Sequence, residues 1–361
     1  MKFLSTIDRY IIKKFLGTYV FAILLIISIT VMFDVNEKID KFIRENSPSL
    51  TDIIFDYYLN FIPYFANLFS PLFTFIAVIF FTSKLADNSE IIAMLSGGIS
   101  FPRLMRPYII SAAIIAIFTF TLNSFIIPPA NITRIAFMNK YIRDKSVDYA
   151  RNVQLEISPG VIAYIGSYND KTSSGRQFSL EKFEDRKLVS RLTAQSITYD
   201  SLYHWTIKDY MIREFTGETE SIERGEKLDT LLTVSPSDFL ISVNDCEQMT
   251  TPALKSYIDK QKRRGIGNIQ LFEIEFHQRF SNTFAAFILT IIGAALSSRK
   301  VKGGMGLNIG IGLGLSFSYI LFMQVTSTFA ISGYVSPMVA VWIPNLIYAG
   351  IGVYLYKKAP R

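Results

Sequence analysis

Five stretches of the chain contain no Asp, Glu, Lys, Arg or His, and they constrain the fold more than any other feature. They are Phe15–Phe33, Tyr57–Ser83, Pro107–Thr133, Phe280–Ser298 and Gly303–Tyr356. A helix needs roughly 20 apolar residues to cross the hydrocarbon core of a bilayer. The last stretch is long enough for two crossings and contains a turn signal at Ser332–Pro337. The sequence therefore predicts six membrane-spanning helices and excludes a soluble enzyme.

The six spans fall into two groups of three, separated by a polar segment. We expect them at Phe15–Phe33, Leu59–Ser83, Pro107–Ile127, Asn282–Ser298, Leu307–Ile331 and Met338–Tyr356. This divides the chain into a membrane region in 1–132, a polar domain in 133–280 and a second membrane region in 281–361. No small-residue cleavage site follows the first span, so we expect it to be retained as a helix.

Short alternating runs of β-branched and aromatic residues fill the polar domain. The expected strands lie in Val153–Tyr168, Gln177–Phe183, Leu188–Tyr199 and Trp205–Phe215. Turn residues separate these runs, and the charged stretch Ala253–Gly265 that follows has a helical period. Regular short strands favour an antiparallel sandwich or open barrel. The predicted fold class is a membrane protein with six transmembrane helices and an inserted all-β domain.

The distribution of basic residues predicts the orientation. With the N-terminus in the cytoplasm, the inner side carries thirteen Lys and Arg residues, and the short outer loops carry only Lys38, Lys41 and Arg44. This satisfies the positive-inside rule, which does not count long loops. We therefore expect both termini in the cytoplasm and the β domain on the outer face. The formal net charge of +7 then reflects topology and anionic lipid, and no nucleic-acid partner is expected.

The sequence contains no catalytic or nucleotide-binding motif. There is no G-x-x-x-x-G-K-[ST] phosphate loop, and the only cysteine, Cys246, allows neither an intrachain disulfide nor a cysteine zinc site. His204 and His277 are expected at a strand edge and at the membrane interface. No acidic pair lies inside the spans, as a proton-coupled transporter would require. We expect no cofactor, no metal and no enzymatic activity, and an energy source outside the chain.

The loop between the second and third spans predicts a short helix near residues 88–98. Asn88 or Ser89 can cap it, and Glu90 in the first turn suits the positive helix end. Gly97-Gly98 ends it in a left-handed conformation. Its apolar residues are Ile91, Ile92, Met94 and Leu95. Such a helix either presents an acidic and apolar surface to a partner or rests on lipid head groups.

Two further features stand near the membrane. Gly306, Gly310 and Gly314 follow one another at four-residue spacing, so one face of the fifth span allows close helix approach. That face serves either packing within the chain or a seam with a partner subunit. Lys38 and Lys41 lie beyond the first span, where they either meet lipid phosphates or belong to a salt-bridged, solvated helix end.

Three segments resemble the LptF/LptG family of lipopolysaccharide-export permeases. They are Ile7–Phe21 (IDRYIIKKFLGTYVF), Ser89–Gly98 (SEIIAMLSGG) and Gly293–Gln324. The order of three spans, β domain and three spans is also similar. The resemblance covers essentially the whole chain, and its opening segment is closer to the LptG branch.

The resemblance implies a permease subunit that takes lipopolysaccharide from the outer leaflet of the inner membrane and passes it to a periplasmic bridge. It implies a jellyroll-like periplasmic domain and three partners: an LptB-like ATPase dimer, a second LptF/LptG-like permease and a single-span LptC-like protein. The ATPase-coupling residues would be Ser89, Glu90, Met94, Leu95 and Gly97. The substrate or gate residues would be Lys38, Lys41, Gly306, Gly310 and Gly314.

The sequence departs from enterobacterial relatives at the outer end of the first span. Asp34 and Asp40 stand where lipid-binding basic residues are expected. Our hypothesis is that an acidic rim disfavours a doubly phosphorylated lipid A. Cross-linking to native lipid from positions 38 and 41 tests it, and the absence of a lipid adduct at both would refute it.

Two other functions remain open at the level of sequence. A membrane-anchored envelope scaffold with a β binding domain would tolerate substitutions in the helix near 88–98. An intramembrane glycan or lipid transferase would need a metal or base, for which the nearest acidic group is Asp34, Glu37 and Asp40.

Overall fold

The computed structural model describes residues 5–44, 47–142, 149–169, 172–185, 187–217, 219–236, 243–263, 269–299 and 304–359. They form two compact units. The helical unit comprises the chain up to residue 142, residues 247–251 and the chain from residue 273. The sheet unit comprises residues 143–246 and 252–272.

In the part of the chain that the structure describes, six helical segments are long and apolar enough to cross a membrane. They contain α1 (Thr6–Phe42), α4 (Ser70–Asp87), α6 (Phe101–Thr121), α11 (Gln270–Ser297), α12 (Gly304–Ile331) and α13 (Pro337–Lys358). The prediction of six spans in two groups of three is confirmed. The chain is therefore a multi-pass membrane protein with a β domain inserted between its helices.

Several helices extend beyond the uncharged stretches. The second span is preceded by α2 (Leu50–Asp52) and the π-helix η1 (Ile53–Tyr58), and it breaks between α3 (Leu59–Leu68) and α4, where Pro71 lies in the first turn. The third span continues from α6 through η2 (Leu122–Ile126), α7 (Ile127–Phe137) and η3 (Met138–Ile142). The boundaries expected at 133 and 280 fall inside helices, because α7 and α11 continue past the uncharged stretches with charged residues such as Arg134 and Arg279.

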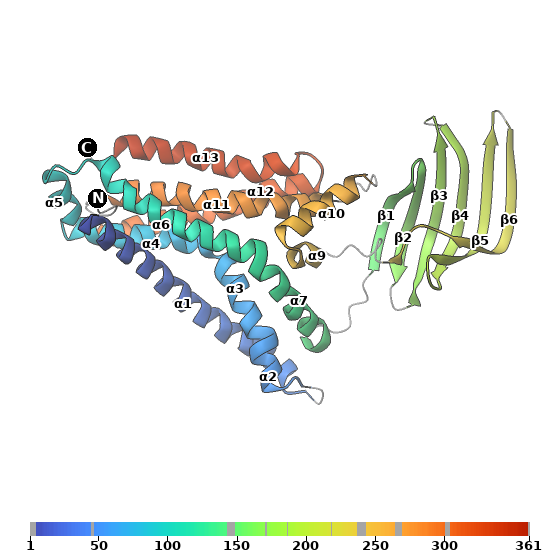
Figure 1. Ribbon diagram of the computed structural model, residues 1–361, viewed down its shortest axis with the longest axis horizontal. Coiled ribbons are helices and arrows are strands. Elements are labelled where there is room, and N and C mark those ends of the chain that lie inside the picture. Colours follow the sequence, from blue (N-terminus) through green and yellow to red (C-terminus); the bar gives the residue numbers. More distant parts are fainter. Residues whose placement is uncertain are drawn as a thin grey trace. The chain divides into compact units, whose positions relative to one another are not determined.

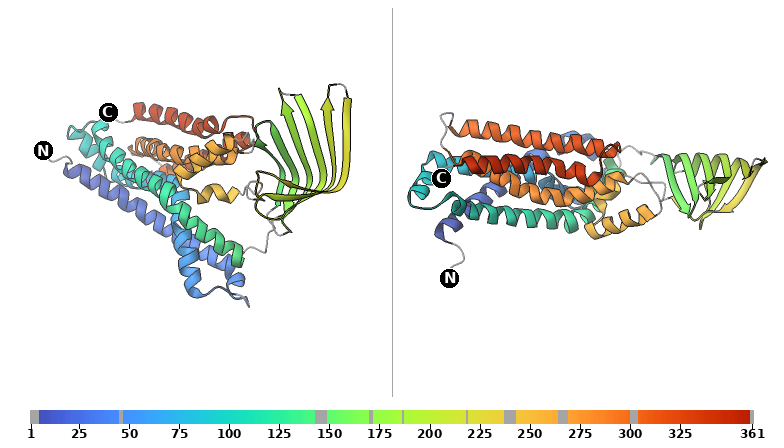
Figure 2. Two further views of the ribbon diagram at one scale, coloured as in Figure 1. Left: turned by 45° about the vertical axis from the view of Figure 1, so that its right-hand side comes forward. Right: turned by 90° about the horizontal axis from the view of Figure 1, so that it is seen from above.

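The helical unit is built around α4, which two hydrophobic clusters share. On one side, Phe81 of α4 stacks on Phe15 of α1 with 5.4 Å between ring centroids. On the other, Ile79 packs in a cluster with α11, α12 and α13. A Cβ on Gly312 would lie 2.1 Å from Ile79 Cδ1, so this glycine lets α12 approach α4 closely. The starts of α1 and α6, the end of α13 and the short α5 (Glu90–Ser96) gather at one end of the unit (Figures 1 and 2).

The sheet unit contains one six-stranded antiparallel sheet (Figure 1). Its strands are β1 (Tyr149–Ser158), β2 (Val161–Asn169), β3 (Ser174–Glu184), β4 (Lys187–Tyr199), β5 (His204–Thr216) and β6 (Thr219–Leu231). Each strand pairs with the next, so the described strands form a meander without the crossover of a Greek key. The predicted antiparallel all-β domain is confirmed, and its strand order, which the sequence left open, is sequential.

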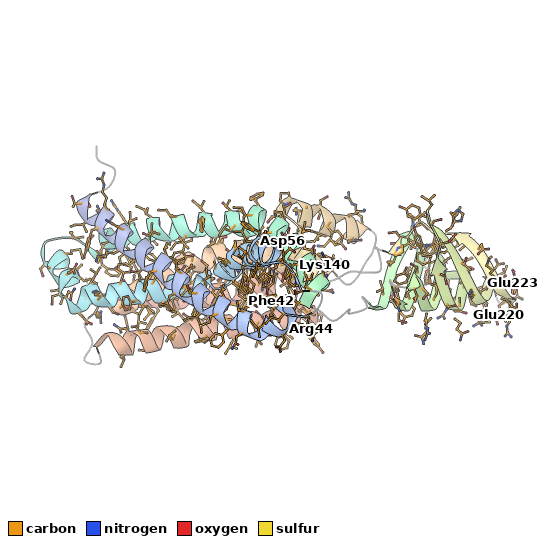
Figure 3. All side chains as sticks on the ribbon, turned by 90° about the horizontal axis from the view of Figure 1, so that it is seen from below. Phe42, Arg44, Asp56, Lys140, Glu220 and Glu223 are labelled. Carbon is orange, nitrogen blue, oxygen red and sulfur yellow. The ribbon has the colours of Figure 1, made fainter. Side chains whose placement is uncertain are left out.

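Two details of the sheet differ from the sequence expectation. The run Val153–Tyr168 is divided between β1 and β2 by a turn in which Gly160 has a φ of +76°, a conformation that favours glycine. The sequence pattern missed β6, where Glu220 and Glu223 lie (Figure 3). The chain then continues through α9 (Val243–Gln248) and α10 (Thr251–Arg263) into α11.

Candidate functional site

Helix α5 is the short helix predicted near residues 88–98, and it packs on the helical unit with one apolar face. Ile91 is buried, and Met94 and Leu95 lie partly buried against the cluster of α1, α4 and α6. Ile92, in contrast, is 51% exposed. The helix therefore presents both an anchored face and an exposed apolar residue.

The ends of α5 agree only in part with the prediction. Ser89 occupies the N-cap position but has a left-handed φ of 60°, and its side chain makes no capping hydrogen bond, so the predicted side-chain cap is wrong. The Asn88 side chain instead donates to Glu90 Oε1 at 3.3 Å. At the other end, Gly98 has a φ of +87°, while Gly97 lies against the Ala93 carbonyl. The left-handed ending is confirmed at Gly98.

Glu90 connects α5 to the start of α1. The Tyr10 hydroxyl donates to Glu90 Oε2 at 3.0 Å. Tyr10 and Glu90 are 80 residues apart in the chain, so this contact is not visible in the sequence. One carboxylate oxygen of Glu90 therefore contacts α1, and the other contacts the turn that precedes α5.

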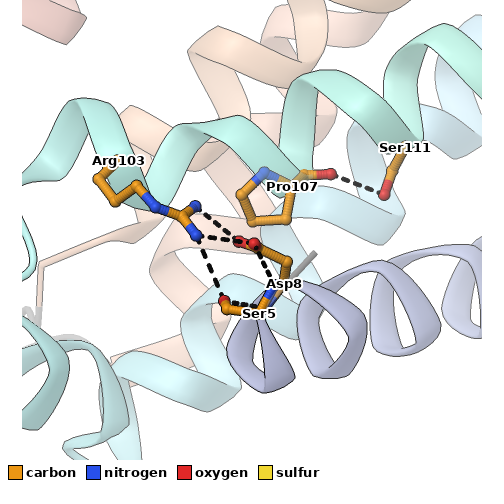
Figure 4. A network of polar contacts seen from close by, with 5 residues as sticks. All are labelled: Ser5, Asp8, Arg103, Pro107 and Ser111. Atoms are coloured by element: carbon orange, nitrogen blue, oxygen red, sulfur yellow. Dashed lines mark hydrogen bonds and ion pairs between the residues drawn. The ribbon is translucent and has the colours of Figure 1, made fainter. Parts of the chain in front are cut away.

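A second connection joins the start of α1 to the start of α6. Arg103 donates to the two carboxylate oxygens of Asp8, each at 2.7 Å, and also to Ser5 Oγ at 3.3 Å (Figure 4). Ser5 and Asp8 form a capping box at the first turn of α1. Bidentate pairing with a guanidinium fixes orientation as well as distance. The S-x-x-D pattern was visible in the sequence, but its partner Arg103 was not.

Lys38 lies inside the helical unit and not on its lipid-facing rim. Its ammonium group pairs with Asp34 and with the Tyr57 hydroxyl, and stands 5.8 Å from the Phe61 ring centroid. The hydroxyls of Tyr57 and Tyr58 donate to the two oxygens of Asp34, each at 3.1 Å. Burial and the Asp34 charge raise the pKa of both tyrosines, so their hydroxyls stay protonated and can donate. Asp34 thus serves an internal polar cluster.

Removing one charge of this cluster is expected to lower the free energy of unfolding more than removing both charges together. Lys38→Met leaves the buried Asp34 carboxylate without its cation and should lower the free energy of unfolding by about 3 kcal/mol. The double variant Asp34→Asn/Lys38→Met keeps an acceptor for one tyrosine, and the new amide nitrogen can donate to the hydroxyl oxygen of the other, so it should recover most of that loss. Thermal unfolding of the purified chain in detergent measures both, and equal losses in the two variants would contradict the arrangement.

Lys41, one turn further on, is partly exposed.

The glycines of α12 separate into two groups. Apart from the backbone of α12 itself, a Cβ on Gly306, Gly310 or Gly314 would meet no atom of the described residues within 4 Å, whereas Gly312 is packed against Ile79. Packing against α4 therefore explains why residue 312 is a glycine, but the described contacts do not explain the glycines at 306, 310 and 314. The face that carries Gly306, Gly310 and Gly314, which we call the glycine face, is open along α12 in the described chain.

Sequence reasoning missed a polar cluster around residues 247–251, the segment that leads from the sheet unit towards α10. Arg134 of α7 contacts Glu247 at 3.4 Å and stacks on the Tyr64 ring, 4.2 Å from its centroid. The Tyr64 hydroxyl donates to the Glu247 carboxylate at 3.2 Å. Asn131 Nδ2 donates to the backbone carbonyl of Glu247, also at 3.2 Å. Burial raises the pKa of Glu247, and the nearby Glu275 raises it further.

Arg279 of α11 holds the same segment from a second helix and is 2% exposed. Its Nε donates to Glu275 at 2.9 Å, and its Nη1 donates to the Met249 carbonyl at 2.9 Å and to Thr251 Oγ1 at 3.1 Å. Two arginines from α7 and α11 therefore fix residues 247–251 to the membrane helices. No sequence motif indicated this, because the partners lie far apart in the chain.

Within the described residues, no group of three or more His, Cys, Asp or Glu side chains is placed to hold a metal ion. The triad Asp34, Glu37 and Asp40 does not converge, since Asp34 faces the cluster with Lys38. The candidate site consists instead of contacts between helices and one open surface. Glu90 connects α5 to α1, Asp8 connects α1 to α6, and the glycine face lies open on α12.

A comparison with curated proteins gave no match. A family model described as lipopolysaccharide export system permease LptF/LptG matches residues 9–358 of the 361 residues. The match spans all six membrane helices and the inserted sheet, and includes α5 and the glycine face. The chain therefore belongs to the LptF/LptG family of lipopolysaccharide export permeases and is a transport subunit.

Proposed function

We propose that this chain is one permease subunit that extracts lipopolysaccharide from the outer leaflet of the inner membrane and passes it to a periplasmic bridge. Both termini and α5 lie in the cytoplasm, and the β domain lies in the periplasm. The work comes from an LptB-like ATPase dimer. Thirteen basic residues on the side of the termini, against three in the short outer loops, support this orientation.

The observation that carries the proposal is the connection of α5 to one long, uninterrupted helix. Glu90 of α5 and Arg103 of the following helix α6 hold the first two turns of α1, through Tyr10–Glu90 and Asp8–Arg103. Helix α1 contains 37 residues, so it is roughly 55 Å long at 1.5 Å per residue. That exceeds the ~30 Å hydrocarbon core. A movement of α5 caused by an ATPase would therefore be transmitted along α1 from one side of the bilayer to the other.

Partner contacts are proposed at three places. The ATPase dimer docks on α5, where Ser89, Glu90, Met94, Leu95 and Gly97 form or support the surface. The second LptF/LptG-like permease meets the glycine face of α12, and an LptC-like protein meets the β domain. Lipopolysaccharide passes between the helices and along the β domain. An apolar path is needed because exposing acyl chains to water costs about 0.8 kcal/mol per methylene.

Replacing Glu90 by Ala is expected to weaken ATPase association while leaving membrane insertion intact. The change removes an acidic group near the docking surface and frees Tyr10. We expect about tenfold less ATPase to co-purify from mild detergent, since interface charge pairs contribute 1.5 kcal/mol or more. Tyr10→Phe keeps the carboxylate and separates the two effects: it should retain the ATPase but reduce transport.

Glu226→Ala on the exposed β6 is the matched control, because it removes an acidic side chain outside α5. It should leave co-purification unchanged. Full recovery of the ATPase with Glu90→Ala would contradict the assignment of α5 as the docking surface.

A further inference from the structure

An apolar groove of about 510 Å³ lies between α6, α11 and α13. It begins at the first turn of α6 and is lined by Pro102, Met105, Ile109, Ile110, Ile291 and Tyr356. Along α6 it extends from Pro102 to Ile110, which is roughly 12 Å at 1.5 Å per residue. This is an elongated apolar slot on the outside of the helical unit, at the end that carries α5.

The groove has a positively charged mouth. Arg106 lines it and is exposed, and none of the lining residues is acidic. Among the ion pairs of the described residues, none involves Arg106. The exposed Lys357 follows the lining residue Tyr356 in the last turn of α13.

The helix that forms most of the groove also favours an anion at this position. Pro102 lies in the first turn of α6, a helix of 21 residues, and the N-terminus of a helix carries partial positive charge. The Ser100 side chain makes no capping hydrogen bond there. A phosphate at the groove mouth would meet both this helix end and the Arg106 guanidinium, while an attached hydrocarbon chain would follow the isoleucines.

We propose that this groove binds one anionic glycerophospholipid, with an acyl chain along Ile109 and Ile110 and the phosphate at Arg106. Basic pockets between membrane helices are suited to anionic head groups. The occupant is a lipid of the surrounding leaflet and not the exported cargo, because the groove opens at the α5 end of the unit. Both the name of that leaflet, cytoplasmic, and the exclusion of the cargo rest on the proposed orientation and function.

The bound lipid would support the region around α5. Phe101, which starts α6 just after the α5 loop, packs on Tyr356 with 5.5 Å between ring centroids. Tyr356 also lines the groove. A lipid in the groove would therefore pack beside the Phe101–Tyr356 contact and help to hold the start of α6 against the end of α13. This site is separate from the glycine face and from the Glu90 contact.

The test is lipid retention by the full-length chain in detergent, measured by native mass spectrometry. Phosphatidylglycerol and phosphatidylcholine with identical acyl chains are the probes. We expect about fivefold preferential retention of phosphatidylglycerol by the unaltered chain. Arg106→Gln should abolish the preference, and Ile110→Trp, which fills the groove, should lower retention of both lipids. Lys13→Gln, an exposed basic residue of α1 outside the groove, should change neither.

Equal retention of the two lipids by the unaltered chain, or an undiminished preference in Arg106→Gln, would overturn the proposal. Displacement of phosphatidylglycerol by an equimolar amount of purified lipopolysaccharide would also overturn it, since the groove would then be a cargo site. Arg106 is exposed and Ile110 is 37% exposed, so both variants should fold, which size-exclusion chromatography checks. The assay needs neither ATPase nor export, so its outcome is independent of the proposed function.

Discussion

Gly310→Leu is expected to abolish lipopolysaccharide export while leaving the chain itself folded. Apart from the backbone of α12 itself, no atom of the described residues lies within 4 Å of a Cβ built on Gly310, so this position has room for a side chain. Leucine also favours a helix interior over glycine by roughly 0.8 kcal/mol. We therefore expect the substitution to act on what the glycine face meets outside the chain.

The expected loss follows from the proposed seam between α12 and the second permease. Small residues let membrane helices approach closely, and a leucine at such a contact prevents the approach. A steric penalty of about 2 kcal/mol would lower association of the two permeases about 30-fold. Co-purification of the second permease and export in cells measure the two consequences.

Gly312→Leu is the matched control on the same helix, two residues away. Its Cβ would stand 2.1 Å from Ile79 Cδ1, so it overpacks the contact between α12 and α4 and should destabilise the chain by about 1–3 kcal/mol. Normal export and normal pairing with Gly310→Leu would show that the glycine face is a lipid-exposed surface with no seam.

Arg279→Ala is expected to cause the largest loss of stability of any single substitution that we propose. Arg279 is buried and donates to Glu275, to the Met249 carbonyl and to Thr251. Its removal leaves a carboxylate and a carbonyl without their donor. Breaking a buried ion pair on one side costs about 3–5 kcal/mol, which is a large part of the 5–15 kcal/mol that keeps a typical protein folded.

We expect the Arg279→Ala chain to accumulate poorly in membranes and to unfold at a clearly lower temperature in detergent. Arg213→Ala is the control, because Arg213 forms a 2.5 Å ion pair with Glu220 in which both side chains are 38% exposed. An exposed pair contributes at most about 1 kcal/mol. A similar small shift in both variants would mean that the attachment of residues 247–251 is not structural.

The helical half of the fold was predictable because an uncharged run of 19 or more residues has few alternatives to a membrane helix. The strands β2 to β5 followed from alternation with one buried face. Strand β6 did not, since every residue from Thr219 to Leu231 is at least partly exposed and many are charged. The end of α7 and the start of α11 were missed because these helices continue past the uncharged stretches with charged residues such as Arg134 and Arg279.

The candidate site was predictable only where its parts are local in the chain. Glu90 in the first turn of α5 and the glycines at four-residue spacing are local patterns, and the structure places both in the expected elements. The contacts of Asp8 with Arg103 span 95 residues, so no spacing rule reveals them. For Lys38 the spacing favoured a salt-bridged helix end over a lipid contact, but its contacts with Tyr57 of η1 and Phe61 of α3 were not visible in the sequence.

A transfer assay in proteoliposomes shows whether work done by a partner ATPase reaches the lipid through this chain. The chain is reconstituted with its second permease and an LptC-like protein, with and without the ATPase, and lipopolysaccharide reaching a soluble periplasmic acceptor is measured on addition of ATP. We predict transfer only when the ATPase is present, and a loss in Glu90→Ala that parallels the loss of bound ATPase. Transfer at the same rate without the ATPase would show that the chain does not depend on a partner for its energy.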